Sequence, residues 1–141
     1  MSAEGNVAVM LEIFTAIAQR DLQRVRERCC PDVEFHWPPS LPYGGVARGV
    51  GGGRPTWTET WTPLQPTETE RQMDPRVVAA TEDEVVVRWV QRGLSPAGDR
   101  LVDPVLGLYR MREGKLARPQ MFYFDTAAVA SFLARVKETA S

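Results

Sequence analysis

The strand that decides the fold reads Arg100-Leu101-Val102-Asp103-Pro104-Val105-Leu106-Gly107-Leu108-Tyr109. It is apolar apart from its first residue and one carboxylate, and side chains alternate between the two faces of a strand. That alternation places Asp103 on the same face as Leu101 and Val105. A carboxylate on an apolar face costs several kcal/mol unless it is paired, protonated or facing a wet cavity. Asp103 is therefore the first candidate for a residue with a chemical role.

Three turns divide the surrounding sequence into strands. They contain glycine, proline or charged residues, and they are Glu82-Asp83, Ser95-Pro96-Ala97-Gly98 and Arg112-Glu113-Gly114. Short connections of this kind join neighbouring antiparallel strands. The pattern predicts an antiparallel meander whose strands cover residues 67–80, 84–94, 99–112 and 115–124.

The first third of the chain carries a helical period instead. Apolar residues spaced three and four apart predict an amphipathic helix over residues 5–19. Asp21 is a typical N-cap for a second helix, which ends before Pro31. The alternation of Val33-Glu34-Phe35-His36-Trp37 then predicts a short strand. Pro38-Pro39 ends it, because proline donates no hydrogen bond to a sheet.

The middle of the chain is rich in glycine and proline. The helical spacing of Trp57 and Trp61 predicts a short helix over residues 55–63, between two loops. The tract Gly49-Val50-Gly51-Gly52-Gly53-Arg54 lacks the Gly-Lys-Ser/Thr continuation of a phosphate-binding loop, and we interpret it as a mobile lid. A last helix begins after Asp125, which is a typical N-cap.

Size and composition bound the function. The length predicts one domain over residues 1–141, and a net charge of −1 gives no basic surface for nucleic acid. Because the N-terminal residues lack the basic stretch of a signal peptide and no apolar run approaches about 20 residues, we expect a cytoplasmic protein without membrane contact. The adjacent Cys29 and Cys30 are expected to be reduced. One histidine and scattered carboxylates lack the spacing of metal ligands, so we expect neither a metal nor another cofactor.

Helices followed by a curved antiparallel sheet predict an α+β domain, with N-terminal helices covering one face of a cone-shaped sheet. Four segments resemble the SnoaL-like group of the nuclear-transport-factor-2 and ketosteroid-isomerase superfamily. They are Pro31-Asp32-Val33-Glu34-Phe35, Leu41-Pro42-Tyr43-Gly44-Gly45-Val46-Ala47-Arg48-Gly49, Arg112-Glu113-Gly114-Lys115-Leu116 and Tyr123-Phe124-Asp125-Thr126. The resemblance covers nearly the whole chain. It implies an apolar cone that binds a hydrophobic, polyketide-like molecule of secondary metabolism, and a homodimer formed through outward residues such as Val102, Leu106 and Leu108.

The chain is also similar to limonene-type epoxide hydrolases, from His36-Trp37-Pro38 through Tyr43-Gly44. Those enzymes use an Asp-Arg-Asp trio, and Arg88 matches the arginine by its distance from Gly98. Valine and phenylalanine stand where the two aspartates of the trio would be. Three positions of the match are expected to line the pocket: Val90, Val105 and Phe122.

The resemblance implies a cofactor-independent cyclase or isomerase, with Asp103 moving a proton next to a carbonyl. Burial raises the pKa of a carboxyl toward neutrality, which makes it useful as an acid or a base. His36 is the expected partner because imidazole titrates near neutral pH, and Glu34 lies on the same strand face. Arg88 could stabilise an enolate. The candidate walls for a flat ligand are aromatic: Trp37, Tyr43, Trp57, Trp61, Trp89 and Tyr123.

These residues also have structural interpretations. Asp103 could sit at a bulge or pair with an arginine, and the tryptophans could simply fill the core. Two other functions therefore stay open. One is epoxide opening, with Asp103 as the acid and His36 or Glu34 activating the nucleophile, and the other is a non-catalytic binding or assembly domain.

Overall fold

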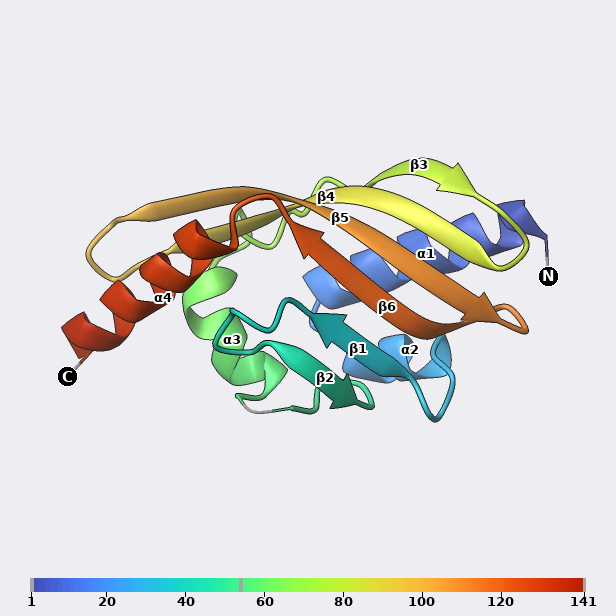
Figure 1. Cartoon of the computed structure of the whole chain (residues 1–141), viewed down its shortest axis with the longest axis horizontal. Helices are drawn as coiled ribbons and strands as arrows, with labels where there is room; N and C mark the ends of the chain where they lie inside the picture. Colours follow the sequence, from blue (N-terminus) through green and yellow to red (C-terminus); the bar gives the residue numbers. More distant parts are fainter. Residues whose placement is uncertain (1, 54, 141) are drawn as a thin grey trace.

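The computed structural model describes residues 2–53 and 55–140 of the 141-residue chain. Figure 1 shows helix α1 running along one face of a curved sheet. The elements, in chain order, are α1 (Ala3–Ala18), α2 (Leu22–Glu27), β1 (Glu34–Trp37), β2 (Gly45–Arg48), α3 (Trp57–Leu64), β3 (Arg76–Ala80), β4 (Glu84–Leu94), β5 (Arg100–Arg112), β6 (Lys115–Tyr123) and α4 (Thr126–Ala140). None of the helices in the described ranges is long and apolar enough to cross a membrane.

The six strands form one sheet in the order β2-β1-β6-β5-β4-β3. Strands β3 to β6 make the predicted antiparallel meander, and β2 is antiparallel to β1. Strand β1, however, runs parallel to β6, with His36 opposite Gln120. The α+β class is confirmed, and the expectation of an entirely antiparallel sheet is wrong at this junction. No hairpin turn sets the direction of β1 relative to β6, because these two strands are remote in the sequence.

Two predicted segments differ from the structure. The strand predicted over residues 67–80 begins only at Arg76. The residues before it form a turn, in which the backbone N–H of Arg71 donates to the carbonyl oxygen of Thr67 at 3.0 Å. The loop predicted ahead of α3 contains strand β2, which gains its extended form by pairing with β1.

The main core lies between α1 and the concave face of the sheet. Met10, Ile13 and Phe14 of α1 belong to one buried cluster with Val87 and Val105 of the central strands. A smaller cluster fixes α4 to the far end of the sheet, and its buried members are Leu41, Leu64, Leu101, Val129 and Phe132. Two separate apolar clusters therefore hold helices on the sheet, one under α1 and one under α4.

Side-chain oxygens cap the N-termini of all four helices in the described ranges, and at α1 the Ser2 hydroxyl accepts a hydrogen bond from the Gly5 N–H at 3.0 Å. The Asp21 carboxylate accepts a hydrogen bond from the Arg24 N–H at 3.1 Å, and the Asp125 carboxylate accepts one from the Ala128 N–H at 3.0 Å. Both N-caps predicted from the sequence are thus confirmed. Helix α3 starts with a capping box between Thr56 and its third helical residue.

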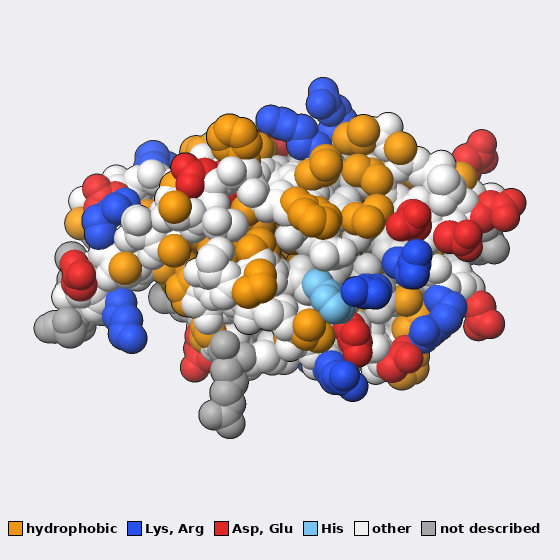
Figure 2. All heavy atoms as spheres, in the orientation of Figure 1, with side chains coloured by type: hydrophobic (Ala, Val, Ile, Leu, Met, Phe, Trp, Pro, Cys, Tyr) orange, Lys and Arg blue, Asp and Glu red, His pale blue; other side chains and the backbone are white. Residues whose placement is uncertain are grey.

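The outer face of the sheet carries exposed apolar side chains. Val46, Val102, Leu106 and Phe122 are between 45% and 65% exposed. Figure 2 shows apolar side chains gathered on this face, over β4, β5 and β6. Patches of this kind on a small domain mark contact surfaces.

The fit of α4 against the sheet makes Gly93 of β4 sensitive to substitution. A Cβ atom at this position would lie 2.8 Å from the ring of Phe132 and 3.3 Å from the Cβ atom of Leu101. Overpacking of this kind costs about 1–3 kcal/mol. We expect Gly93→Ala to lower the free energy of unfolding by that amount in urea titrations, while Val102→Ala on the exposed face changes it by less than about 0.5 kcal/mol. Equal effects of the two substitutions would contradict this packing.

Candidate active site

A cavity of about 140 Å³ lies between the concave face of the sheet, α1 and α3. Its wall is rich in aromatic side chains, which are Phe14, Phe35, Trp37, Tyr43, Trp57, Trp61, Trp89, Tyr109 and Tyr123. An engineered apolar cavity of about 150 Å³ binds benzene. The space therefore accommodates an aromatic ring without rearrangement of the fold.

Edge-to-face contacts hold the rings of this wall in place. The centroid of Trp57 lies 4.9 Å from that of Phe35 and 6.2 Å from that of Trp37, with interplanar angles of 88° and 86°. Phe35 and Trp37 stack on each other at 5.3 Å, although they are two residues apart on β1. Such pairs contribute about 0.5–1.5 kcal/mol beyond their buried area. The wall is thus built by α3 and β1 together.

The loop that was interpreted as a lid forms part of the same wall. Gly52 and Gly53 line the cavity, and Gly51 adopts a positive φ of 79°, which glycine tolerates without strain. Arg54, the last residue of the tract, lies outside the described residues. Movement of this loop stays a prediction.

Two tyrosine hydroxyls provide the main polar feature of the cavity. The Tyr43 hydroxyl donates a hydrogen bond to the Tyr123 hydroxyl at 2.7 Å. Burial raises the pKa of both phenols far above physiological pH. Both side chains are therefore neutral, and the pair can donate a hydrogen bond to an oxygen atom of a ligand.

The cavity wall is otherwise uncharged. Within the described residues, no Asp, Glu, Lys, Arg or His side chain lines it, and the further polar residues are Thr60, Gln65 and Gln91. The indole N–H groups of Trp57 and Trp89 are buried and find no acceptor in the described part of the protein. An unpaired buried donor costs about 1–3 kcal/mol, which an acceptor on a ligand would recover.

Asp103 lies just outside the cavity wall. It is 2% exposed, and its Oδ1 atom accepts a hydrogen bond from the backbone N–H of Asp125 at 3.0 Å. Its Oδ2 atom is buried and has no hydrogen-bond partner among the described residues. The charge of Asp103 acts on the hydroxyls of Tyr43 and Tyr123, which places the carboxyl within electrostatic range of the pair.

The register of the sheet explains this position. Gln91 of β4, which lines the cavity, lies opposite Asp103 of β5. One step along the same face, Trp89, Val105 and Tyr123 form a row across three strands. Burial raises the pKa of Asp103, and the neighbouring Asp125 carboxylate adds to that rise, whereas the Asp125 N–H opposes it. Asp103 therefore combines a structural contact at the start of α4 with a buried, unpaired oxygen.

Comparison with known proteins matches residues 10–118 to the family model described as a SnoaL-like domain. The chain belongs to the SnoaL-like domain family. Uncharacterised proteins of Mycobacterium bovis (Mb0035) and Mycobacterium tuberculosis (Rv0034) are each 29% identical to it over 134 residues, which is 95% of this chain and 100% of each relative. The match thus spans each relative completely and nearly all of this chain.

Solved structures show the same fold. The SnoaL-like domain superposes on TerC, co-crystallised with polyporic acid, with a TM-score of 0.74 at 21% identity, covering 94% of this chain and 98% of TerC. It superposes on IdmH, described as a putative polyketide cyclase from Streptomyces antibioticus, with a TM-score of 0.66 at 21% identity, covering 92% and 98%. An NTF2-like protein from Burkholderia xenovorans gives 0.69 at 19% identity, covering 93% and 97%. The expected NTF2-like α+β fold is confirmed.

The structure brings together most of the aromatic residues selected from the sequence of this SnoaL-like domain. Trp37, Tyr43, Trp57 and Trp61 line the cavity, together with Trp89 and Tyr123. Val105 points inward as expected, but it is packed in the core beside the cavity and does not line it. Asp103 is on the inner face, as the alternation predicts.

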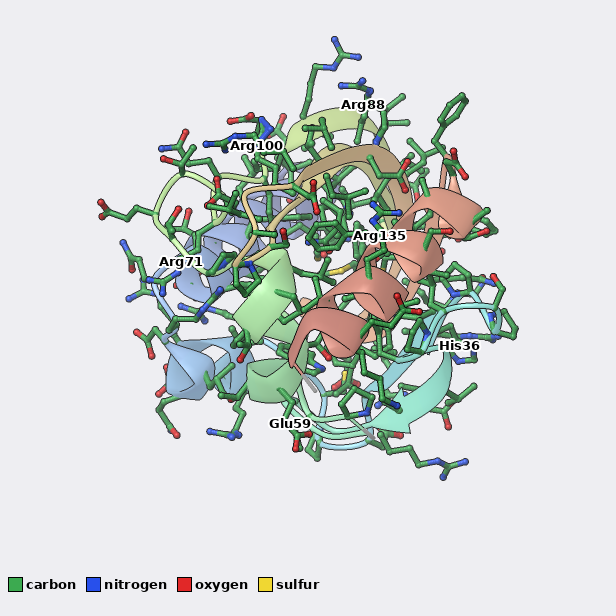
Figure 3. All side chains as sticks on the ribbon, turned by 90° about the vertical axis from the view of Figure 1, so that its left-hand side faces the viewer. His36, Glu59, Arg71, Arg88, Arg100 and Arg135 are labelled. Carbon is green, nitrogen blue, oxygen red and sulfur yellow. The ribbon has the colours of Figure 1, made fainter. Side chains whose placement is uncertain are left out.

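The two polar residues of β1 lie on the wrong face for the predicted role. Phe35 and Trp37 fill the inner face, so Glu34 and His36 point outward. His36 lies 3.4 Å from Glu34, which also approaches Arg48 at 3.3 Å. Figures 2 and 3 show His36 at the outer surface. The expectation that Glu34 and His36 meet Asp103 in the cavity is wrong.

The positions matched to the epoxide-hydrolase trio also lie outside the cavity. Arg88 is exposed on the outer face, and Leu106 and Phe122 follow it in register across β5 and β6. Val90, one step along β4, shares this face. The expected roles of Arg88 as a cavity cation and of Val90 and Phe122 as pocket walls are therefore wrong, because each is out of phase with the inward residues of its own strand.

Sequence reasoning missed several cavity residues. Gln91 is two positions from Trp89, so the alternation of β4 was a signal that could have found it. Tyr109 points inward by the same rule. A Cβ atom added to Gly107 would lie only 2.2 Å from the Tyr109 hydroxyl oxygen, so the ring needs a glycine at this position. Gln65 ends α3 and had no comparable signal. No group of three or more His, Cys, Asp or Glu in the described ranges is placed to hold a metal ion.

The raised pKa of Asp103 predicts how stability depends on pH. The folded carboxyl keeps its proton above 3.8, the pKa of an unperturbed aspartate, so the unfolded state ionises first as the pH rises and the contribution of Asp103 to the free energy of unfolding falls across that range. Asp103→Asn removes this dependence. The free energy of unfolding of Asp103→Asn minus that of the wild type should therefore increase from pH 3 to pH 7 in urea titrations.

Asp32→Asn is the matched control, because Arg112 lowers the pKa of Asp32 and the contribution of Asp32 to the free energy of unfolding therefore rises with pH. The corresponding difference for Asp32→Asn should change in the opposite direction. A pH-independent difference for Asp103→Asn would show that burial does not affect the ionisation of this carboxyl.

Proposed function

We propose that this SnoaL-like domain is a cofactor-independent acid/base enzyme that cyclises or isomerises a flat, hydrophobic small molecule with carbonyl oxygens. The observation that carries the proposal is the Tyr43–Tyr123 hydroxyl pair, which lies in an otherwise apolar cavity with the unpaired Asp103 oxygen close behind it. A neutral donor pair in dry surroundings stabilises an oxygen atom on which negative charge develops.

The proposed chemistry follows from the protonation states. The phenol pair donates a hydrogen bond to a carbonyl oxygen of the ligand and stabilises the enolate that forms there. A water molecule takes the proton from the carbon beside the carbonyl and returns it at the new position, so both tyrosines keep their protons. A protonated Asp103 carboxyl behind the pair carries no negative charge that would oppose the enolate. Asp103 acts through Tyr123 and is a positioning residue, because it does not line the cavity itself. The raised pKa of Asp103 favours the protonated form that this step requires.

The two named structural relatives support a small, oxygenated aromatic ligand. TerC was crystallised with polyporic acid, and IdmH is described as a putative polyketide cyclase. At 21% identity their likeness establishes the shared fold. The aromatic wall of this chain independently suits a flat ring, and its buried indole donors suit ligand oxygens.

A second candidate is a non-catalytic domain that binds the same class of ligand. Two observations favour it: no charged side chain among the described residues lines the cavity, and one oxygen of Asp103 is engaged by the backbone N–H of Asp125. Both candidates predict ligand binding, and they differ only in proton transfer. The test must therefore measure proton transfer directly.

Exchange of the α-hydrogens of 2-tetralone in D₂O, followed by NMR, is such a test. We expect the wild type to accelerate exchange over buffer and Tyr123→Phe to slow it by about 10²-fold, the effect of removing the donor to the ligand oxygen. Asp103→Asn should flatten the pH profile of the exchange rate. His36→Ala and Arg88→Gln, both on the outer face, should exchange like the wild type. Binding of 2-tetralone without accelerated exchange would refute catalysis and favour the binding domain.

We also propose that the chain forms a homodimer through the outer face of its sheet. The exposed Leu106 and Phe122 lie opposite each other in register, with Val102 on the same face, and burying them would remove apolar surface from water. Sedimentation velocity at micromolar concentration should give twice the chain mass. Phe122→Asp should give a monomer, whereas Leu11→Gln on the exposed side of α1 should not. A monomeric wild type would contradict the dimer.

A further inference from the structure

A pair of arginines beside the cavity has no carboxylate partner in the part of the chain that the structure describes. Arg20 and Arg71 are half-buried, and within the described ranges neither makes an ion pair with a carboxylate. Arg92, which is also half-buried, does so, lying 2.5 Å from Asp74. Arg26 and Arg76 also lack a salt bridge among the described residues, but both are exposed to solvent, where water satisfies them.

The guanidinium of Arg20 is held by neutral groups only. It donates to the carbonyl oxygen of Ile17 at 2.8 Å, to Gln65 Oε1 at 3.0 Å and to the carbonyl oxygen of Gln65 at 2.9 Å. Its Cζ atom lies 3.8 Å from the centroid of the Trp61 ring. A guanidinium has five N–H donors, so two remain for another acceptor.

Arg71 lies close enough for its charge to act on Arg20. Burial lowers the pKa of Arg20 to about 10, and the positive charge of Arg71 adds to this effect. The Nε atom of Arg71 is buried and finds no acceptor in the described part of the chain. Figure 3 shows Arg71 on the side of the molecule where α1 ends. Two neighbouring cations, one with a buried unpaired donor, repel each other unless an anion lies between them.

The carboxylates nearest in sequence are engaged elsewhere. Glu70 accepts a hydrogen bond from the Thr67 hydroxyl and lies 3.3 Å from Arg100. Asp21 caps α2 through the Arg24 N–H. The counter-charge for the two arginines is therefore not supplied by their own neighbours in the chain.

The arginine pair adjoins the cavity through two shared residues. Trp61 and Gln65, which contact Arg20, both line the cavity. An anionic group bound at the pair would lie next to a ring bound inside. Carboxylate and phosphate oxygens are the acceptors that guanidinium groups prefer.

We propose that Arg20 and Arg71 form an oxyanion site that receives the carboxylate or phosphate of an aromatic ligand whose ring occupies the cavity. This inference deepens the proposed function, since it rests on the cavity binding a ring, and it names the ligand class as an aromatic acid. The arginine site lies beside Trp61 and would be a second polar anchor for the ligand, distinct from the Tyr43–Tyr123 pair.

Isothermal titration calorimetry tests the site by comparing the dissociation constants of 2-naphthoate and its neutral analogue 2-naphthamide. We expect the wild type to bind 2-naphthoate about tenfold more tightly, the effect of one charge-assisted contact. Arg71→Gln should abolish this preference while keeping the affinity for 2-naphthamide, which shows that the cavity is still folded. Arg76→Gln, at an exposed arginine of β3, should keep the preference. Equal binding of both compounds by the wild type, or a preference that survives Arg71→Gln, would overturn the proposal.

Inorganic phosphate distinguishes the source of the anion. Phosphate that competes with 2-naphthoate and not with 2-naphthamide supports a shared site, whereas phosphate that binds without competing would show that the anion is not part of the ligand. If neither naphthalene compound binds, the cavity proposal fails. The arginine pair is then judged by the melting temperature: a rise with phosphate that Arg71→Gln abolishes supports an oxyanion site, and no rise refutes it.

Discussion

The register of the β4–β5 hairpin is the constraint on which the rest of the structure depends. Every residue of β4 from Glu84 to Leu94 has a partner in β5, so the inward or outward direction of each side chain follows from its position alone. The inward set packs against α1 or faces the cavity, and the outward set leaves an apolar surface. A slip of one residue would exchange the two faces, placing Trp89 in solvent and Arg88 in the core.

The candidate site follows from this division. Large aromatic side chains from β1, α3 and β4 support one another at their edges and leave space between them. Hydroxyl and indole donors provide polarity without charge, while the carboxyl of Asp103 is kept behind the wall. Ionisable side chains lie at the margins, with His36 on the outer face and Arg20 beside Trp61. The arrangement suits a ligand that is apolar in the middle and oxygenated at its edges.

Local sequence signals predicted the meander, the helices and both N-caps, because turns, alternation and capping residues act over a few positions. The parallel pairing of β1 with β6 and the existence of β2 depend on contacts between distant segments, which no local pattern records. For β1, alternation separated Glu34 and His36 from Phe35 and Trp37, but it could not say which pair faces inward until the aromatic wall was in place. For β4, the apolar residues Val87 and Trp89 already indicated which positions point inward, and Arg88 lies between them on the opposite face. Arg88 was selected from the family match, which conflicts with this alternation. The inward position of Asp103 was predicted correctly because its strand has one strongly apolar face.

The parallel junction between β1 and β6 has a consequence for the order of assembly. The partner of His36 is Gln120, so the first strand cannot complete its pairing until more than half of the chain has been synthesised. Until then Phe35 and Trp37 lack the surface against which they are finally buried. Contacts between residues so far apart in the sequence form slowly, and apolar segments stay exposed on the nascent chain until they form. The strand that carries Phe35 and Trp37 is therefore a segment that chaperones would need to shield during translation.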